Sequence, residues 1–232
     1  MEKTQAIILA SGGLDSSVLA YYVKKRLKKK IKLLFFDYGQ KCLREEIFCV
    51  KKLASELGIP YKTINLQDLK KISTSLINSY KKRHKNEIIK WYVPFRNSIF
   101  LAIALAFAES EFIKGKGKSD IFIGVKYEGE IRFKDTSEEF IKEMNDIARF
   151  SEKGKFKIKA PFINKDKEEI IELGKKLGVD FESNYSCYVG GGFAKINKKK
   201  IPIHCGKCAG CKARKKGFKF SNVRDVSLYK NF

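Results

Sequence analysis

The sequence predicts an α/β protein, a doubly wound five-stranded parallel sheet followed by a cysteine-rich appendage. Three observations lead to this fold class. Short apolar runs alternate with stretches whose apolar residues recur at helical spacing. Such alternation is typical of βαβ units, which place parallel strands in one sheet and helices on both faces. Residues 181–232 leave this pattern and carry four of the six cysteines, so we expect a main domain at 1–180 and an appended segment at 181–232.

The first unit is the segment IILASGGLDSSVLAYYVKKR (7–26). Residues 6–10 form a continuous apolar run with β-branched members, which predicts a strand buried on both faces. Apolar residues then recur at helical spacing from Leu14, so a helix is expected to start near Asp15.

The later units repeat this order of strand and helix. The helix after the second strand should end at Gly58 and Pro60. The helix at 96–110 is apolar nearly all round and is expected to be buried. Residues 67–92 are polar and irregular. Further strands are predicted at 31–38, 61–66, 120–125 and 156–162, and further helices at about 41–57, 96–110, 136–150 and 165–178.

The composition is that of a single domain of this class. The chain has 232 residues, of which 44% are hydrophobic, enough to bury a core. No uncharged apolar run reaches the roughly 18 residues of a membrane-spanning helix, and the first residues lack the profile of a signal peptide. We therefore expect a cytoplasmic protein without a membrane partner.

The net charge of +23 is a feature of nucleic-acid binders, because a basic surface attracts phosphates. The lysines, however, are spread over runs such as KKRLKKK (24–30), KKRHK (81–85) and KINKKK (195–200), without interleaved aromatic residues. We favour a lysine-rich solvated surface, and the charge also suits a site for small polyanions.

Four motifs follow the predicted strands directly. Because ligands bind beyond the C-terminal ends of strands in such sheets, these motifs should meet at one edge. They are SGGLDSS (11–17), FDYGQ (36–40), GVKYEG (124–129) and APF (160–162).

The SGGLDSS loop is the expected anion site. Gly12 and Gly13 permit conformations and close approaches that a Cβ would forbid. The helix N-terminus behind them offers unpaired N–H groups and a partial positive charge, and Ser11, Ser16 and Ser17 add hydroxyls. The loop matches neither the Walker pattern nor G-x-G-x-x-G. An ordinary strand-to-helix turn with a capping Asp or Ser is the alternative.

Four cysteines form a metal-ligand pattern. The last three have C-x2-C-x2-C spacing, which lets thiolates converge on one ion. In a cytosolic protein this favours tetrahedral zinc over disulfides, and an iron–sulfur cluster is the rival. Cys42 and Cys49 are instead expected in the core. The four ligands are Cys187, Cys205, Cys208 and Cys211.

Together these motifs resemble a known family. SGGLDSS after a buried strand is similar to the PP-loop of the N-type ATP pyrophosphatases, which split ATP into AMP and pyrophosphate. The further motifs resemble, in order and over nearly the whole chain, those of the QueC family. They are FDYGQ (36–40), YVPFRN (92–97), K-x-E-I-I-x-L-G (167–174), S-C-Y (186–188), C-G-K-C-x-x-C-x-x-R (205–214) and G-F (217–218).

One segment departs from the family pattern. The family's substrate segment usually reads G-x-x-x-x-D-x-S-G-Y-P-D-C-R, and GVKYEGEIRFKDTS (124–137) aligns with it without a gap. Gly124, an aromatic residue (Phe133) and Asp135 are retained. Differences at the following positions leave the exact substrate open: Gly129, Ile131, Arg132, Thr136 and Ser137.

The resemblance implies an ATP-dependent ligase that converts 7-carboxy-7-deazaguanine and ammonia to 7-cyano-7-deazaguanine (preQ0), through an adenylated carboxylate and an adenylated amide. The product serves queuosine- or archaeosine-type synthesis. ATP, Mg²⁺ and Zn²⁺ are the implied cofactors, and a homodimer stays open. Two alternatives are a QueC-like enzyme that attaches a deazaguanine to another acceptor, such as a protein in antiphage defence, and a tRNA-binding PP-loop modification protein.

The resemblance also implies roles for single residues. It assigns catalysis to Ser11, Asp15, Ser16, Arg96 and Lys167. It assigns substrate contacts to Arg96, Asn97, Phe133 and Asp135. ATP contacts fall to Ala10, Ser11, Gly12, Gly13, Leu14, Asp15, Ser16, Ser17, Phe36, Tyr38, Gly39 and Gln40. Four of these residues have structural alternatives: a packed core aromatic for Tyr38, a surface residue near a helix start for Arg96, a solvated first-turn lysine for Lys167 and an exposed helix-start carboxylate for Asp135.

Overall fold

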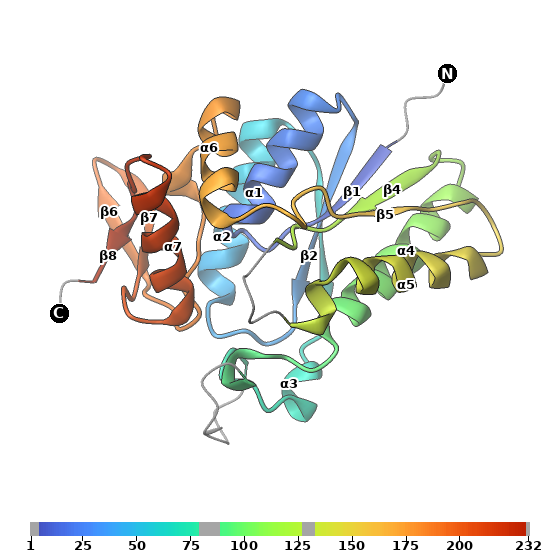
Figure 1. Cartoon of the computed structure of the whole chain (residues 1–232), viewed down its shortest axis with the longest axis horizontal. Helices are drawn as coiled ribbons and strands as arrows, with labels where there is room; N and C mark the ends of the chain where they lie inside the picture. Colours follow the sequence, from blue (N-terminus) through green and yellow to red (C-terminus); the bar gives the residue numbers. More distant parts are fainter. Residues whose placement is uncertain (1–4, 79–88, 127–132, 231–232) are drawn as a thin grey trace.

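A parallel sheet of five strands lies at the centre of the protein (Figure 1). The computed structural model describes residues 5–78, 89–126 and 133–230. The strand order is β3-β2-β1-β4-β5, so the chain winds outward from β1 in both directions. This confirms the doubly wound sheet that the sequence predicts. The strands are β1 (Gln5–Leu9), β2 (Ile31–Asp37), β3 (Tyr61–Asn65), β4 (Ser119–Phe122) and β5 (Ile158–Lys159).

Helices cover both faces of the sheet (Figure 1). Successive strand residues point to opposite faces, so Ile8 and Leu33 join one buried cluster and Ile7 and Leu34 join the other. The first cluster includes residues of α1 (Leu14–Tyr21), α2 (Leu43–Leu57) and α6 (Lys167–Leu177), and the second includes residues of α4 (Arg96–Ile113) and α5 (Glu138–Ile147). The short helix α3 (Leu69–Ile72) follows β3.

Two elements differ from the sequence prediction. The strand expected at 156–162 is only two residues long, since β5 is an edge strand that pairs with β4 alone and is followed by Pro161, which has no N–H to donate. Helix α4 is not buried all round, because one side of it faces solvent, where Ala102 and Ala106 are exposed. Small apolar side chains on a surface are ordinary.

The C-terminal segment contains a second small sheet that the sequence analysis does not anticipate. Strand β7 (Lys199–His204) pairs antiparallel with β6 (Phe193–Ile196) and parallel with β8 (Leu228–Tyr229). Helix α7 (Ala209–Phe220) packs closely on α6, because a Cβ at Gly217 would lie 2.3 Å from Cγ of Lys167.

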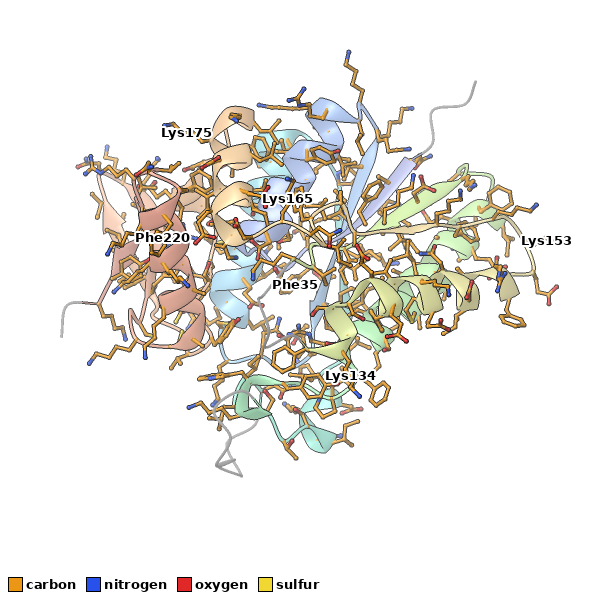
Figure 2. The ribbon with its side chains drawn as sticks, viewed as in Figure 1. Phe35, Lys134, Lys153, Lys165, Lys175 and Phe220 are labelled. Carbon is orange, nitrogen blue, oxygen red and sulfur yellow. The ribbon has the colours of Figure 1, made fainter. Side chains whose placement is uncertain are left out.

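Lysine side chains extend from many elements of the fold. Figure 2 labels Lys134 before α5, Lys153 after it, Lys165 before α6 and Lys175 within α6. Lys134, Lys153 and Lys175 are exposed, whereas Phe35 lies in the core. In the described ranges, no helix has the length and apolar character needed to cross a membrane.

Candidate active site and metal centre

A cavity of about 310 Å³ opens beside the C-terminal end of β1, where the strand order reverses. Ligands bind at this point in open parallel sheets. Its walls come from the SGGLDSS loop, the ends of β2 and β4, the start of α4, Lys167 of α6 and residues 185–188. The cavity therefore lies at the edge of the sheet where the sequence motifs are expected to meet.

The loop at 11–13 is shaped by close contacts. Gly12 has φ +71°, and a Cβ there would lie 2.5 Å from the carbonyl oxygen of Glu46, so a side chain does not fit. The Gly13 carbonyl accepts hydrogen bonds from the hydroxyls of Ser16 (3.1 Å) and Ser17 (2.9 Å). Ser11 Oγ accepts from Gly13 N–H and lies 3.1 Å from Ser16 Oγ. The hydroxyls thus surround the N-terminus of α1.

Asp15 and Lys167 form an ion pair at this loop. The Lys167 Nζ lies 2.6 Å from both carboxylate oxygens of Asp15, and the side chains are only 16% and 23% exposed, respectively. Burial lowers the pKa of Lys167, and the nearby Asp15 charge opposes that shift. Lys167 is therefore not the solvated first-turn lysine of the alternative interpretation.

The end of β2 and the residues after it form the aromatic wall of the cavity. Phe36 stacks on Phe100 with ring centroids 4.1 Å apart, and Tyr38 meets the same ring edge-on at 5.5 Å. Gln40 accepts from the Tyr38 N–H and donates to the Phe36 carbonyl oxygen. Gly39 has φ +77°, and a Cβ there would lie 2.9 Å from Lys70 Cδ.

Arg96 and Asn97 line the cavity from the first turn of α4. The Arg96 guanidinium lies 6.0 Å from the centre of the Tyr38 ring. The Asn97 amide donates to the backbone oxygen of Asp135 (3.0 Å), and Phe133 stacks on Tyr92 with ring centroids 5.2 Å apart.

The structure brings most of the predicted site residues together. Nine of the twelve ATP-contact candidates line the cavity, as do Arg96, Asn97 and Lys167. The other described candidates lie in adjoining segments: Gly12, Ser17, Gly39, Phe133 and Asp135. Of the positions that differ from the family pattern, Thr136 lines the cavity, and Gly129, Ile131 and Arg132 fall outside the described residues.

Some lining residues were not predicted. Glu46 and Cys42 reach the cavity from the start of α2, and Tyr185 and Tyr188 reach it from the C-terminal segment. In the sequence, Glu46 belongs to the amphipathic run LREEIF (43–48), where a charged residue suggests a solvated face. Its only signal is that it follows the FDYGQ motif by less than two helical turns.

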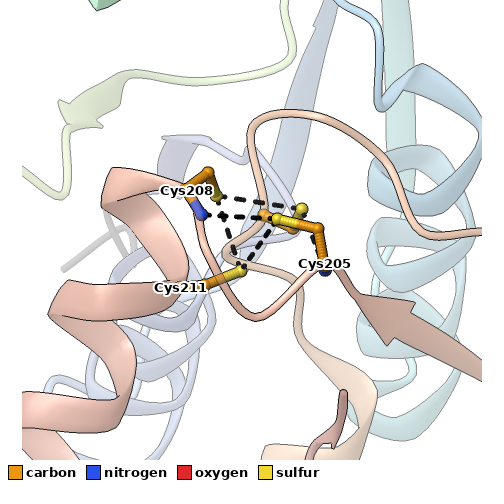
Figure 3. Close-up of side chains that lie close together, drawn as sticks. Cys205, Cys208 and Cys211 are labelled. Atoms are coloured by element: carbon orange, nitrogen blue, oxygen red, sulfur yellow. Dashed lines mark hydrogen bonds between the residues drawn. The ribbon is translucent and has the colours of Figure 1, made fainter. Parts of the chain in front are cut away.

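The four predicted metal ligands come together, and Figure 3 labels three of them, Cys205, Cys208 and Cys211. Their Sγ atoms all lie within 4.8 Å of one another, and three pairs are 3.5, 3.9 and 3.9 Å apart. A tetrahedral ion with metal–sulfur distances of about 2.3 Å would place sulfurs about 3.8 Å apart. The cluster therefore fits a single metal ion held by Cys187, Cys205, Cys208 and Cys211.

Backbone N–H groups surround these sulfurs. Cys205 N–H donates to Cys187 Sγ, Cys208 N–H to Cys205 Sγ and Tyr188 N–H to Cys208 Sγ, each at 3.4 Å. Such donors stabilise thiolates, the form that binds metal. Cys42 and Cys49 are buried, as the sequence predicts, and pack against this cluster.

Comparison with known proteins gives one consistent family. The family model described as "Queuosine biosynthesis protein QueC" matches residues 5–222. A 7-cyano-7-deazaguanine synthase from Nitratiruptor sp. is 36% identical, covering 98% of this chain and 99% of its own length. The protein of the same name from Methanosphaera stadtmanae is 33% identical with the same coverage. Among solved structures, the U34-tRNA thiolase NcsA from Methanococcus maripaludis aligns over 96% of this chain and 66% of its own, at 16% identity and a TM-score of 0.49. With matches that span nearly its whole length, the chain belongs to the QueC family.

Proposed function

We propose that this chain is an ATP-dependent C–N ligase that converts 7-carboxy-7-deazaguanine and ammonia to 7-cyano-7-deazaguanine, for queuosine- or archaeosine-type synthesis. One observation carries the proposal. A single cavity collects the serine-rich loop at the N-terminus of α1 and the side chains of Arg96, Asn97 and Lys167, in a chain of the QueC family.

The chemistry explains the need for ATP. A carboxylate is a poor electrophile because its leaving group would be oxide. Attack of the carboxylate on the α-phosphate forms an acyl adenylate, whose leaving group is AMP. Ammonia then gives the amide, and a second adenylation lets the amide oxygen depart as AMP, which leaves the nitrile.

Within this reaction the protein positions reactants and stabilises charge. The N–H groups of α1 and the hydroxyls of Ser11 and Ser16 would hold the phosphates. Lys167 and Arg96 would neutralise the departing pyrophosphate. Asp15 offers carboxylate oxygens of the kind that Mg²⁺ prefers, and this ion would supply further charge neutralisation.

The deazaguanine would lie at the α4 side of the cavity. Arg96 and Asn97 face this side, and Asn97 holds the segment that carries Asp135. In the proposal Asp135 accepts hydrogen bonds from the N–H edge of the base, and Phe133 packs beside it. A site that pairs such donors rejects analogues without them by about 10⁴-fold or more.

For the cysteine cluster we propose zinc with a structural role. Four thiolates within 4.8 Å of one another suit one tetrahedral ion, whereas a four-iron cluster would hold its cysteines on separate iron atoms and farther apart. A site closed by four thiolates leaves no position for substrate. We further propose the division into residues 1–180 and a zinc-binding segment at 181–232, and a cytoplasmic location.

The relatives from Nitratiruptor and Methanosphaera do not favour the alternatives of a protein acceptor or tRNA binding, since both are named for the synthase. The direct test is to incubate the protein with 7-carboxy- or 7-amido-7-deazaguanine, MgATP and ammonium, and to identify products by mass. Nitrile from both compounds is expected. Pyrophosphate release should disappear when both Asp15 and Ser16 are replaced by alanine. Failure of the wild type to adenylate either compound would refute the proposal.

A further inference from the structure

Glu46, in the first turn of α2, lines the cavity and has no role in the steps above. Its Oε1 accepts a hydrogen bond from the Cys42 thiol (3.1 Å), and its Oε2 accepts one from the Gln40 amide (2.9 Å). A carboxylate oxygen can accept two hydrogen bonds. Each oxygen therefore has capacity for one more donor.

Charge distinguishes Glu46 from its neighbours in the cavity wall. Of the described lining residues, Asp15 and Glu46 carry carboxylates, and Asp15 is paired with Lys167. Glu46 instead accepts hydrogen bonds from two neutral donors, the Gln40 amide and the Cys42 thiol. The cationic lining residues Arg96, Lys126 and Lys167 attract phosphates and repel cations. Among the described lining residues, Glu46 is therefore the group best suited to bind a small cation.

The surroundings also make Glu46 suited to proton transfer. Burial raises its pKa to about 7, although hydrogen bonds from Cys42 and Gln40 and the charge of Arg96 oppose the shift. Glu45 on the same helix adds to the rise. The Glu46 charge also contributes to the raised pKa of Tyr38 after β2 and of Cys49 in α2. A base with a pKa near the working pH can both accept a proton and release it.

We propose that Glu46 binds ammonium in the cavity and accepts its proton, and so provides the ammonia that forms the amide. The inference rests on the proposed function, which requires ammonia as the nitrogen source. Ammonium is the main form of ammonia at neutral pH, and it cannot attack a carbon because it has no lone pair.

The step balances in protons and electrons. One N–H bond of ammonium breaks, its electron pair stays on nitrogen, and the proton moves to Glu46. The nitrogen lone pair then forms a bond to the carboxyl carbon of the acyl adenylate. The bond from this carbon to the phosphate oxygen breaks, and AMP leaves with the electron pair and with a proton from the new amide nitrogen. Glu46 returns its own proton to water before the next turnover.

Glu46→Gln tests the proposal, because glutamine keeps the size of the side chain but does not act as a base. Each variant is assayed with 7-carboxy-7-deazaguanine, MgATP and either ammonium or hydroxylamine at neutral pH. Hydroxylamine is uncharged there and needs no base before it attacks. In Glu46→Gln, we expect amide formation from ammonium to fall by about 10²-fold or more, while hydroxamate formation from hydroxylamine keeps most of its rate. Glu46→Asp, which retains a carboxylate, should recover part of the ammonium rate.

Glu56→Gln is the matched control, because Glu56 lies on the same helix and accepts a hydrogen bond from the Tyr21 hydroxyl (3.3 Å) outside the cavity. It should leave both rates unchanged. Equal losses with both nucleophiles in Glu46→Gln would show that Glu46 only shapes the site, and no loss with ammonium would show that it has no role; either result overturns the proposal. A wild-type protein that releases no pyrophosphate with the carboxylate would instead refute the proposed function on which this step depends.

Discussion

The two partners of the Asp15–Lys167 ion pair should differ in how much stability their removal costs. Asp15→Asn leaves the Lys167 ammonium charged and only 16% exposed, without an anion beside it. Lys167→Met leaves Asp15 in the first turn of α1, where the helix dipole still stabilises a negative charge. Asp15→Asn should therefore be the more destabilising change.

The magnitudes follow from this geometry. Breaking a fully buried ion pair by removing one partner costs roughly 3–5 kcal/mol. Because both side chains retain some exposure, 16% and 23%, we expect a loss of about 2–3 kcal/mol for Asp15→Asn. The helix dipole should make the loss in Lys167→Met smaller by about 1 kcal/mol.

Urea unfolding at pH 7 measures the difference. With a slope of about 2–3 kcal/mol per molar urea, 1 kcal/mol separates the two midpoints by about 0.3–0.5 M. Lys165→Met is the matched control, because Lys165 forms an exposed pair with Glu169 at 3.1 Å, and such pairs contribute about 0.5 kcal/mol or less. Equal midpoints for Asp15→Asn and Lys167→Met, or the reverse order, would refute the reasoning.

The pH dependence gives a second readout of the same variants. The pKa of Lys167 is already below its ordinary value through burial, and the Asp15 charge limits that fall. Without Asp15 the pKa should fall further. The folded state then binds fewer protons than the unfolded state, so stability rises with pH up to the unfolded lysine pKa of about 10.4. The deficit of Asp15→Asn should therefore shrink between pH 7 and pH 10.

Three other changes have defined outcomes. Gly12→Ala should displace the loop and abolish MgATP binding in calorimetry, because its Cβ would lie 2.5 Å from the Glu46 carbonyl oxygen and φ is +71°; normal binding would contradict this. Gly210→Ala places a Cβ 2.0 Å from the Ser186 carbonyl oxygen, so elemental analysis should find less bound metal per chain than in the wild type. Arg214 counteracts burial and holds the pKa of Asp225 below its usual range. That stabilisation is present above the unfolded pKa of about 4 and is lost as pH falls through the lower folded value. The stability gap between wild type and Asp225→Asn should thus narrow below about pH 4, and a constant gap would argue against it.

The parallel sheet could be predicted because its signals are local. Runs such as IILA and LLFF are buried on both faces and read as strands at any position. The small sheet of β6, β7 and β8 gives no such signal. The lysine-rich segment KINKKK (195–200) spans the end of β6, the turn and the start of β7, and β8 is a two-residue strand held by pairing with β7. Their strand conformation depends on contacts between segments, which sequence periodicity does not report.

The same distinction applies to the candidate site. The loop at 11–17 and the cysteine spacing were visible because neighbouring residues make one structure. The ion pair of Asp15 with Lys167 joins two distant segments, and the position of Glu46 depends on Gly12, whose Cα approaches the first turn of α2. Packing between segments decides whether such a carboxylate faces solvent or a cavity, and the spacing of residues in the sequence does not report that packing.

The cysteine cluster and the cavity share one stretch of backbone, residues 185–188. Tyr185 N–H donates to the Gly12 carbonyl oxygen at 2.8 Å, which joins the SGGLDSS loop to the chain two residues before Cys187. Tyr185, Ser186, Cys187 and Tyr188 also line the cavity. A metal bound by four thiolates can therefore influence the chemistry without touching substrate, because it fixes the position of this wall. It follows that any ion that keeps tetrahedral thiolate geometry should support activity, whereas loss of the ion should free residues 185–188 and weaken ATP binding at the loop.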